Sequence, residues 1–189
     1  MGLTLVTPPT EEPVTLEEAK THLRVHHTDE DSYIEGLIKA ATRHTEKVLG
    51  KSLMTRTYRL TLDAFSDAIE LPRGPVQSVT SVQYVDADGK TQAIASGNYT
   101  VDLTSARQWI VRNSGFSWPS TIDAVNAVSV TYVAGHDELP AELEDLRHAL
   151  LLLVGHWFFQ REAVNVGSTV TEVPLAYDAL IQPYRAVLV

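Results

Sequence analysis

The sequence predicts an α+β protein, in which a helical body carries an inserted small antiparallel β-sheet and a C-terminal arm. Three observations support this class: helical apolar periodicity over residues 12–52, two-residue alternation within 53–135, and helical periodicity again over 138–162. Residues 163–189 are expected to form the arm. Because 189 residues with 44% hydrophobic content can bury one sizeable core, we expect a single domain, 1–189.

The first part of the chain is expected to form two N-terminal helices. Thr15 followed by Glu18 is a capping-box pattern that opens a short helix with Leu23 near its end. The acidic run 29–31 opens a longer helix, and Gly50 is placed to stop it. The apolar positions expected on the longer helix are Ile34, Leu37, Ile38, Ala41, Val48 and Leu49. A helical hairpin is predicted.

The middle of the chain is expected to form the sheet. Residues 58–62 and 79–85 show strand-like patterns, and the second run leads into the turn sequence Asp86-Ala87-Asp88-Gly89. Further strand candidates are 99–103, 109–112 and 125–133. The loop 115–119 carries two large aromatics, which more often plug the edge of a core than bind a ligand.

The late helix, expected over Leu139–Glu162, has more apolar surface than one core-facing stripe needs. Pro140 and the acidic residues that follow it suit a helix start. The core stripe is expected to comprise Leu143, Leu146, Leu150, Leu153, Val154 and Trp157. Leu152 and Phe159 fall on roughly the opposite side, with Gly155 between them, and this side is a candidate subunit interface. The alternative is that both sides are buried within one subunit.

Charge and composition exclude several classes of function. Residues 1–60 contain 8 basic residues (Lys and Arg) and 9 acidic residues (Asp and Glu). Residues 61–135 contain 4 basic and 7 acidic residues, and residues 136–189 contain 3 and 8. No segment is basic, which argues against tight nucleic-acid binding, although an acidic surface suits a passage along which DNA slides. The absence of cysteine excludes disulfides and thiolate metal sites and suits a reducing compartment. No signal peptide or membrane span is expected.

Catalytic motifs are not found in the sequence. His22 and His26 have the i, i+4 spacing of a metal pair, but position 23 is Leu where a metalloprotease has glutamate, so solvated or capping histidines are expected. His148 and His156 are interpreted as structural or interfacial. Asp86 and Asp88 are assigned to the turn. No nucleophile elbow or phosphate-binding loop occurs, so we expect neither an enzyme nor a cofactor or metal.

Two alternative functions stay open at this point. Trp109, Phe116 and Trp118 are candidates for a small-ligand or carbohydrate-binding module, because aromatic faces stack on sugars. A hydrolase that uses Asp or Glu is the weaker alternative, because no carboxylate pair lies outside an ordinary turn or helix face.

Short motifs in consistent order along the chain resemble a known family. They are Val14-Thr15-Leu16-Glu17-Glu18-Ala19-Lys20, residues 23–25 and 29–31, Leu71-Pro72-Arg73-Gly74-Pro75-Val76 with 78–86, Val130-Thr131-Tyr132-Val133-Ala134-Gly135, and residues 150–157 with 161–164 and 174–175. In these motifs the chain resembles the small head-tail connector proteins, also called adaptor or head-completion proteins, of long-tailed bacteriophages and gene transfer agents.

The resemblance implies a non-enzymatic virion protein. Such a protein is assembled in the bacterial cytoplasm, lies in the neck of the particle, and forms a homo-oligomeric ring, typically dodecameric. The ring binds the portal protein on one side and a neck, stopper or tail-completion protein on the other, and DNA passes through its channel without sequence-specific binding. The arm is then expected to dock on the portal through Val166, Val170, Val173, Leu175, Tyr184, Val187 and Leu188.

Overall fold

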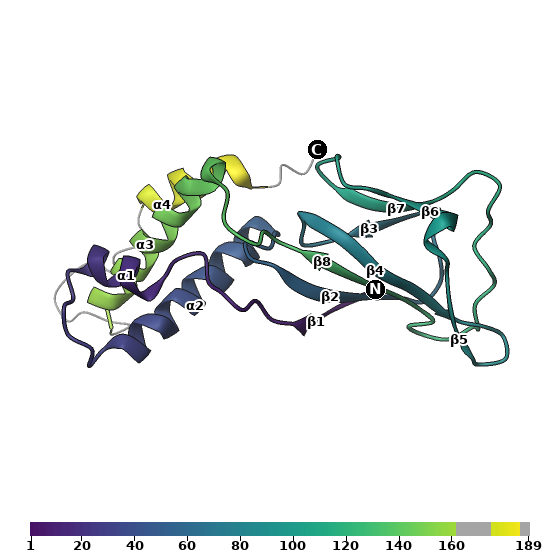
Figure 1. Ribbon diagram of the computed structural model, residues 1–189, viewed down its shortest axis with the longest axis horizontal. Coiled ribbons are helices and arrows are strands. Elements are labelled where there is room, and N and C mark those ends of the chain that lie inside the picture. Colours follow the sequence, from purple (N-terminus) through teal and green to yellow (C-terminus); the bar gives the residue numbers. More distant parts are fainter. Residues whose placement is uncertain (162–174, 186–189) are drawn as a thin grey trace. The chain divides into compact units, whose positions relative to one another are not determined.

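The computed structural model describes residues 1–161 and 175–185, which form two compact units (Figure 1). The sheet unit comprises Met1–Thr10 and Met54–Asp137, and the helical unit comprises Glu11–Leu53 and Glu138–Val189. Each unit is therefore built from two separate stretches of the chain. The mixed helix and antiparallel-sheet content confirms the predicted α+β class. The single domain over 1–189 stays a prediction.

The N-terminal hairpin of the helical unit follows the expected signals. In α1 (Leu16–Leu23) the capping box is formed: the Thr15 amide donates to Glu18 Oε2 at 2.7 Å, and the Glu18 amide donates to Thr15 Oγ1 at 3.2 Å. The second helix, α2 (Asp31–Leu49), ends at Gly50, whose φ of 67° a glycine adopts without strain. Of the expected apolar stripe, Val48 lies at the surface, and Thr42, Thr45 and Glu46 are buried beside the apolar residues.

The late helix is shorter than predicted. Pro140 has extended backbone, a 3₁₀ turn covers Ala141–Leu143, and α3 runs over Glu144–Phe159. Gln160 leaves the helical conformation, with ψ of 75°. Beyond it, the Arg161 guanidinium carbon lies 4.6 Å from the ring centroid of Tyr33, and Arg161 pairs with Glu30 at the start of α2. These contacts favour the break after Phe159, which local periodicity does not reveal.

The helices enclose their own hydrophobic core. The predicted stripe is buried at Leu146, Leu150, Leu153 and Val154, whereas Trp157 is only half-buried and its neighbour Phe158 is buried instead. The short helix α4 (Leu175–Ile181) lies within the segment assigned to the arm, and a 3₁₀ turn over Gln182–Tyr184 follows it. It adds Tyr177 and Ile181 to the core.

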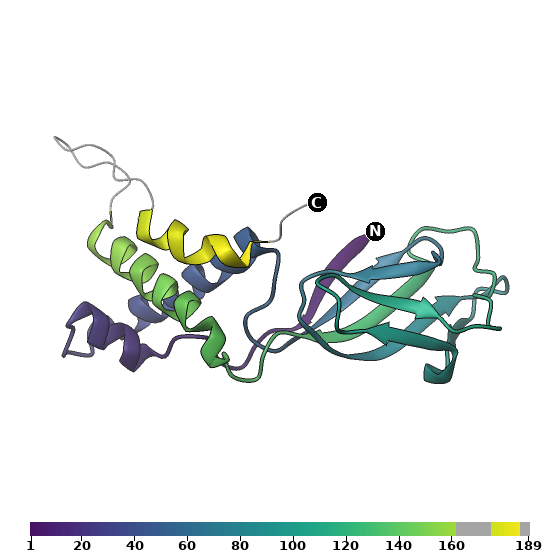
Figure 2. The same ribbon diagram turned by 90° about the horizontal axis from the view of Figure 1, so that it is seen from above.

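The sheet unit contains two antiparallel sheets where the sequence analysis expects one. The larger has the strand order β1-β2-β8-β4-β5, and the smaller has the order β3-β7-β6. A single core cluster draws on both sheets, so they pack face to face (Figure 2). The strands are β1 (Gly2–Thr7), β2 (Arg56–Leu62), β3 (Ala68–Leu71), β4 (Val76–Val85), β5 (Thr91–Ala93), β6 (Tyr99–Asp102), β7 (Gln108–Arg112) and β8 (Val128–Ala134), with a 3₁₀ turn over Ser96–Asn98.

The hairpin between β4 and β5 confirms the turn assigned to residues 86–89. Asp86 Oδ1 accepts the amides of Asp88 at 3.0 Å and Lys90 at 2.9 Å, and Asp86 Oδ2 accepts the side-chain amide of Gln92 at 2.8 Å. The bond from Gln92 and the backbone bonds together lower the pKa of Asp86. Its carboxylate therefore serves the turn.

The aromatic loop of the sheet unit packs against the second core. The Trp118 ring stacks on Phe65, with centroids 4.6 Å apart and planes within 2°, and Phe116 meets Trp118 edge to face at 5.8 Å. The plugging interpretation is thus confirmed for Trp118. The strand expected from Val125 instead begins at Val128, and Val125 lies exposed in the preceding loop.

Candidate interaction surface

One face of α3 lies beside α1 at the margin of the helical core and carries apolar side chains. Four residues that are three or four positions apart lie along one side of the helix: His148, Leu152, Gly155 and Phe159. The Phe159 side chain is 74% exposed, and Leu152 is half-buried. A phenylalanine this exposed leaves a large apolar ring in water, and it marks this side of α3 as a candidate contact surface.

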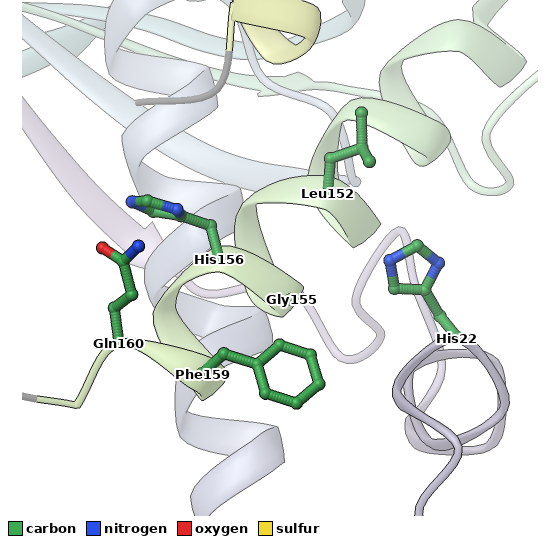
Figure 3. A pocket seen from close by; sticks show the side chains of 6 residues that line it. All are labelled: His22, Leu152, Gly155, His156, Phe159 and Gln160. Atoms are coloured by element: carbon green, nitrogen blue, oxygen red, sulfur yellow. The ribbon is translucent and has the colours of Figure 1, made fainter. Parts of the chain in front are cut away.

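A shallow groove of about 350 Å³ runs along this face, and we call it the α3 groove. Its lining residues are His22, Leu152, Gly155, His156, Phe159 and Gln160. Figure 3 shows the Phe159 ring directed toward α1, which carries His22, and Gly155 on the turn of α3 next to Phe159. All of these residues belong to the helical unit, so the groove is complete within it. Leu152, Gly155 and Phe159, proposed from their spacing alone, are therefore brought together around one depression.

Gly155 allows α1 to approach α3 closely. A Cβ atom added to Gly155 would lie 3.3 Å from His22 Nε2 and 3.9 Å from Leu23 Cδ2, and the first distance is tighter than ordinary packing. This packing explains a glycine inside a helix, where alanine would otherwise be more stable by about 1 kcal/mol. Glycine at this position is thus used for packing within the unit, at the floor of the α3 groove. The sequence reveals the unusual glycine but not its neighbour.

Sequence spacing proposes neither His22 nor Gln160, which also line this surface. Partial burial lowers the pKa of His22, and the nearby positive charge of His148 lowers it further. The imidazole is therefore held toward its neutral form, which suits a side chain beside Leu152 and Phe159. The sequence marks His22 only through its metal-pair spacing with His26. No group of three or more His, Asp or Glu within residues 1–161 and 175–185 is placed to hold a metal ion.

The lowered pKa of His22 predicts how acid affects the helical unit. Because the folded-state pKa lies below the unfolded value of about 6.5, the unfolded chain binds the proton more readily, and stability falls as pH drops below that value. Replacing His22 with glutamine should remove this part of the pH dependence. Urea unfolding of wild type and His22→Gln at pH of about 7.5 and about 5.5 measures it. Equal losses of stability in both proteins would contradict this role for His22.

The residues proposed for portal docking are only partly described. Five of them lie outside the described residues: Val166, Val170, Val173, Val187 and Leu188. Leu175 begins α4 and is 84% exposed, whereas the Tyr184 hydroxyl donates to the carbonyl of Glu142 at 3.0 Å. Of the two described residues, Leu175 therefore has the apolar side chain that is more available for contact with a portal.

The aromatics of the alternative ligand-binding module are not gathered on one surface. Trp109 lies on β7 between the buried residues Gln108 and Ile110, so it faces away from the core, whereas Trp118 packs against that core. One face of Trp118 is covered by Phe65. The structure thus provides no shared stacking platform for a sugar among these three residues.

Three further findings concern known proteins and membranes. Residues 13–86, which span α1, α2 and strands β2 to β4, match the family model described as "Phage gp6-like head-tail connector protein". No curated protein matches the sequence. Within the described residues, no helix combines the length and apolar character needed to cross a membrane.

Solved structures match the whole chain. A chain in "Neck of empty GTA particle computed with C6 symmetry" is 27% identical with a TM-score of 0.82, and the match covers 100% of this chain and 97% of that one. A chain in "Virion of native gene transfer agent (GTA) particle" gives the same values. A chain in "Neck of native GTA particle computed with C12 symmetry" has a TM-score of 0.79 at the same identity and coverage. The resemblance to head-tail connector proteins is therefore confirmed. The sequence of residues 13–86 matches a phage connector family, and the fold of the whole chain matches proteins of gene transfer agent particles.

Proposed function

We propose that this chain is a structural connector in the neck of a phage-like particle. Its copies form a ring under the portal, join the head to the neck or tail, and leave a channel for DNA. The observation that carries the proposal is the full-length similarity to chains of gene transfer agent particles, two of them neck structures computed with sixfold and twelvefold symmetry. A role of this kind is structural and requires no catalytic group.

The α3 groove is the proposed contact between neighbouring copies in the ring. Copies related by a rotation meet through two different surfaces, so the groove face of one copy would contact another surface of the next. Phe159 and Leu152 supply the apolar part of this contact, and burial of the exposed Phe159 ring would contribute about 2 kcal/mol. Gly155 shapes the groove floor without itself reaching the neighbour. Each lateral contact can be weak, because a portal would hold several copies at high effective concentration.

The charge of the chain suits the passage of DNA. With a net charge of -9, the ring would repel the phosphate backbone, so DNA slides through and is not retained. The C-terminal segment is the proposed portal contact, with Leu175 as its exposed described residue and Val166, Val170, Val173, Val187 and Leu188 as its other apolar residues.

Electron microscopy of particles made without this chain tests the proposed function. We expect DNA-filled heads that lack tails and lose their DNA, and we expect tailed particles to return when the chain is supplied in trans. The matched control supplies the chain with Val125→Asp, a change at an exposed apolar residue in a loop of the sheet unit, which should restore tails equally well. Normal tailed particles in the deletion strain would overturn the connector function.

A further inference from the structure

The N-terminal strand β1 leaves one side of the larger sheet open. It pairs with β2 and with no other strand among the described residues (Figure 2). All six of its residues are exposed. Its outer edge therefore presents backbone N–H and C=O groups that no strand of the described chain takes up. Such an edge can pair with an added strand.

The inner face of β1 extends the apolar surface of the sheet by one strand. Leu3 pairs with Leu60 and Leu5 with Tyr58, and residues opposite each other in an antiparallel pair point to the same face. Leu60 and Tyr58 are buried in the core between the sheets, yet Leu3 and Leu5 are 37% and 46% exposed. These two leucines thus point to the same side of the sheet as the core residues, but they lie beyond the side chains that cover that core. A further strand with apolar residues on the same face would cover them.

The edge of β1 also lacks the features that usually prevent strand addition. From Gly2 to Thr7 it has neither a charged residue nor a proline, and its β-bulge lies only near its end, between Leu5 and Thr7. At the opposite edge of the same sheet, β5 has only three residues and directly follows Lys90. Short strands and lysines are common protection of an edge. One edge is therefore protected, and the other is open.

A charged residue near the edge indicates which strand would fit. Thr4 pairs with Arg59, so both point to the outer face of the sheet, and Arg59 is exposed. An added strand lies one spacing of about 4.8 Å beyond β1, so its residue beside Thr4 is roughly 10 Å from the Arg59 backbone. The arginine side chain spans much of that distance. An acidic residue at this position would therefore be favoured.

We infer that the open edge of β1 binds an extended segment of another protein, with apolar residues at alternate positions and an acidic residue facing outward between them. A second copy of this chain fits less well. In a pair of β1 strands, Thr4 of each copy would have no carboxylate opposite it, because β1 contains none. This surface is separate from the α3 groove and belongs to the sheet unit.

A peptide titration of the isolated full-length chain tests the inference. The probe is an eight-residue peptide in which valine and threonine alternate and one central threonine is replaced by glutamate, and the control peptide carries lysine there. Amide exchange of β1 is followed by NMR, with Leu5→Lys as the edge variant and Val125→Lys as its matched control at an exposed loop residue. Neither α3 nor a particle takes part, so failure here would leave the proposed connector function standing.

We expect the glutamate peptide to slow exchange of alternate β1 amides by about tenfold at saturation. The lysine peptide should bind about threefold to fivefold more weakly, and Leu5→Lys should weaken binding of the glutamate peptide by about tenfold while Val125→Lys leaves it unchanged. Unprotected β1 amides, or equal binding to wild type and Leu5→Lys, would overturn the inference. Protection that grows with protein concentration without peptide would assign the edge to a second copy and overturn the proposed occupant.

Discussion

Replacing Phe159 with aspartate should leave the helical unit folded and prevent the ring from assembling. The side chain is 74% exposed and meets only the edge of Phe158, so its loss and the new charge at the C-terminal end of α3 should together cost about 1 kcal/mol of unfolding free energy. In the proposed ring, however, the aspartate would bury an unpaired charge at every subunit contact. Loss of a central aromatic typically costs on the order of 2 kcal/mol per contact, or about 30-fold in affinity. The effect is repeated around the ring.

The neighbouring residue provides the matched control for Phe159→Asp. Phe158 is 8% exposed and packs among the helices, so Phe158→Ala should destabilise the helical unit by roughly 3 kcal/mol or more. Urea unfolding of both variants and electron microscopy of particles complemented with Phe159→Asp separate stability from assembly. If Phe159→Asp unfolds like Phe158→Ala, Phe159 belongs to the core. If it folds and supports normal necks, the α3 groove is not the subunit contact.

Ending the chain at Glu162 should strongly destabilise the helical unit, because α4 forms part of its core. Tyr177 and Ile181 are fully buried, and the Tyr177 hydroxyl lies 3.0 Å from Thr45 Oγ1 of α2. Losing two buried side chains and one buried hydrogen bond removes on the order of 5 kcal/mol, which is comparable to the whole stability of many domains. Unfolding can be followed by the fluorescence of Trp157, whose ring contacts His44 in the same unit.

A chain that ends at Arg185 is the matched control for this truncation. It keeps α4 and the contact of Tyr184 with Glu142 but removes Val187 and Leu188. Its stability should equal that of the full chain within about 0.5 kcal/mol. It therefore tests portal docking cleanly: reduced attachment to portals would support the arm proposal for the last residues, and normal attachment would remove Val187 and Leu188 from it. Wild-type stability of the chain ending at Glu162 would show that α4 is dispensable.

Much of the helical unit follows from local signals in the sequence. The capping box at Thr15 and the stop at Gly50 depend on neighbours within a few residues, and both form as predicted. The buried stripe of α3 is predicted at four positions because helical periodicity places them on one face. The start of α3 is less predictable, since Pro140 suits either the first turn of a helix or the extended backbone that it adopts here.

The strands were harder to predict where they are short or exposed. The four residues of β3 give too little alternation to recognise. All six residues of β1 are exposed, so its strand conformation depends on pairing with β2, more than fifty residues away in the chain. The division into two facing sheets also depends on which side of each strand meets the other sheet, and that is a property of the folded unit.

The sequence by itself determined the α+β class, the helical hairpin and the turn at residues 86–89, because each depends on spacing along the chain. It also proposed Leu152, Gly155 and Phe159 as an interface, which stays a prediction. The tertiary structure decided the rest. It placed His22 against Gly155, put Phe158 rather than Trp157 in the core, and left Leu3 and Leu5 open at the edge of β1. These outcomes result from packing between residues far apart in the chain, and periodicity within one segment carries no information about the distant surface that covers it.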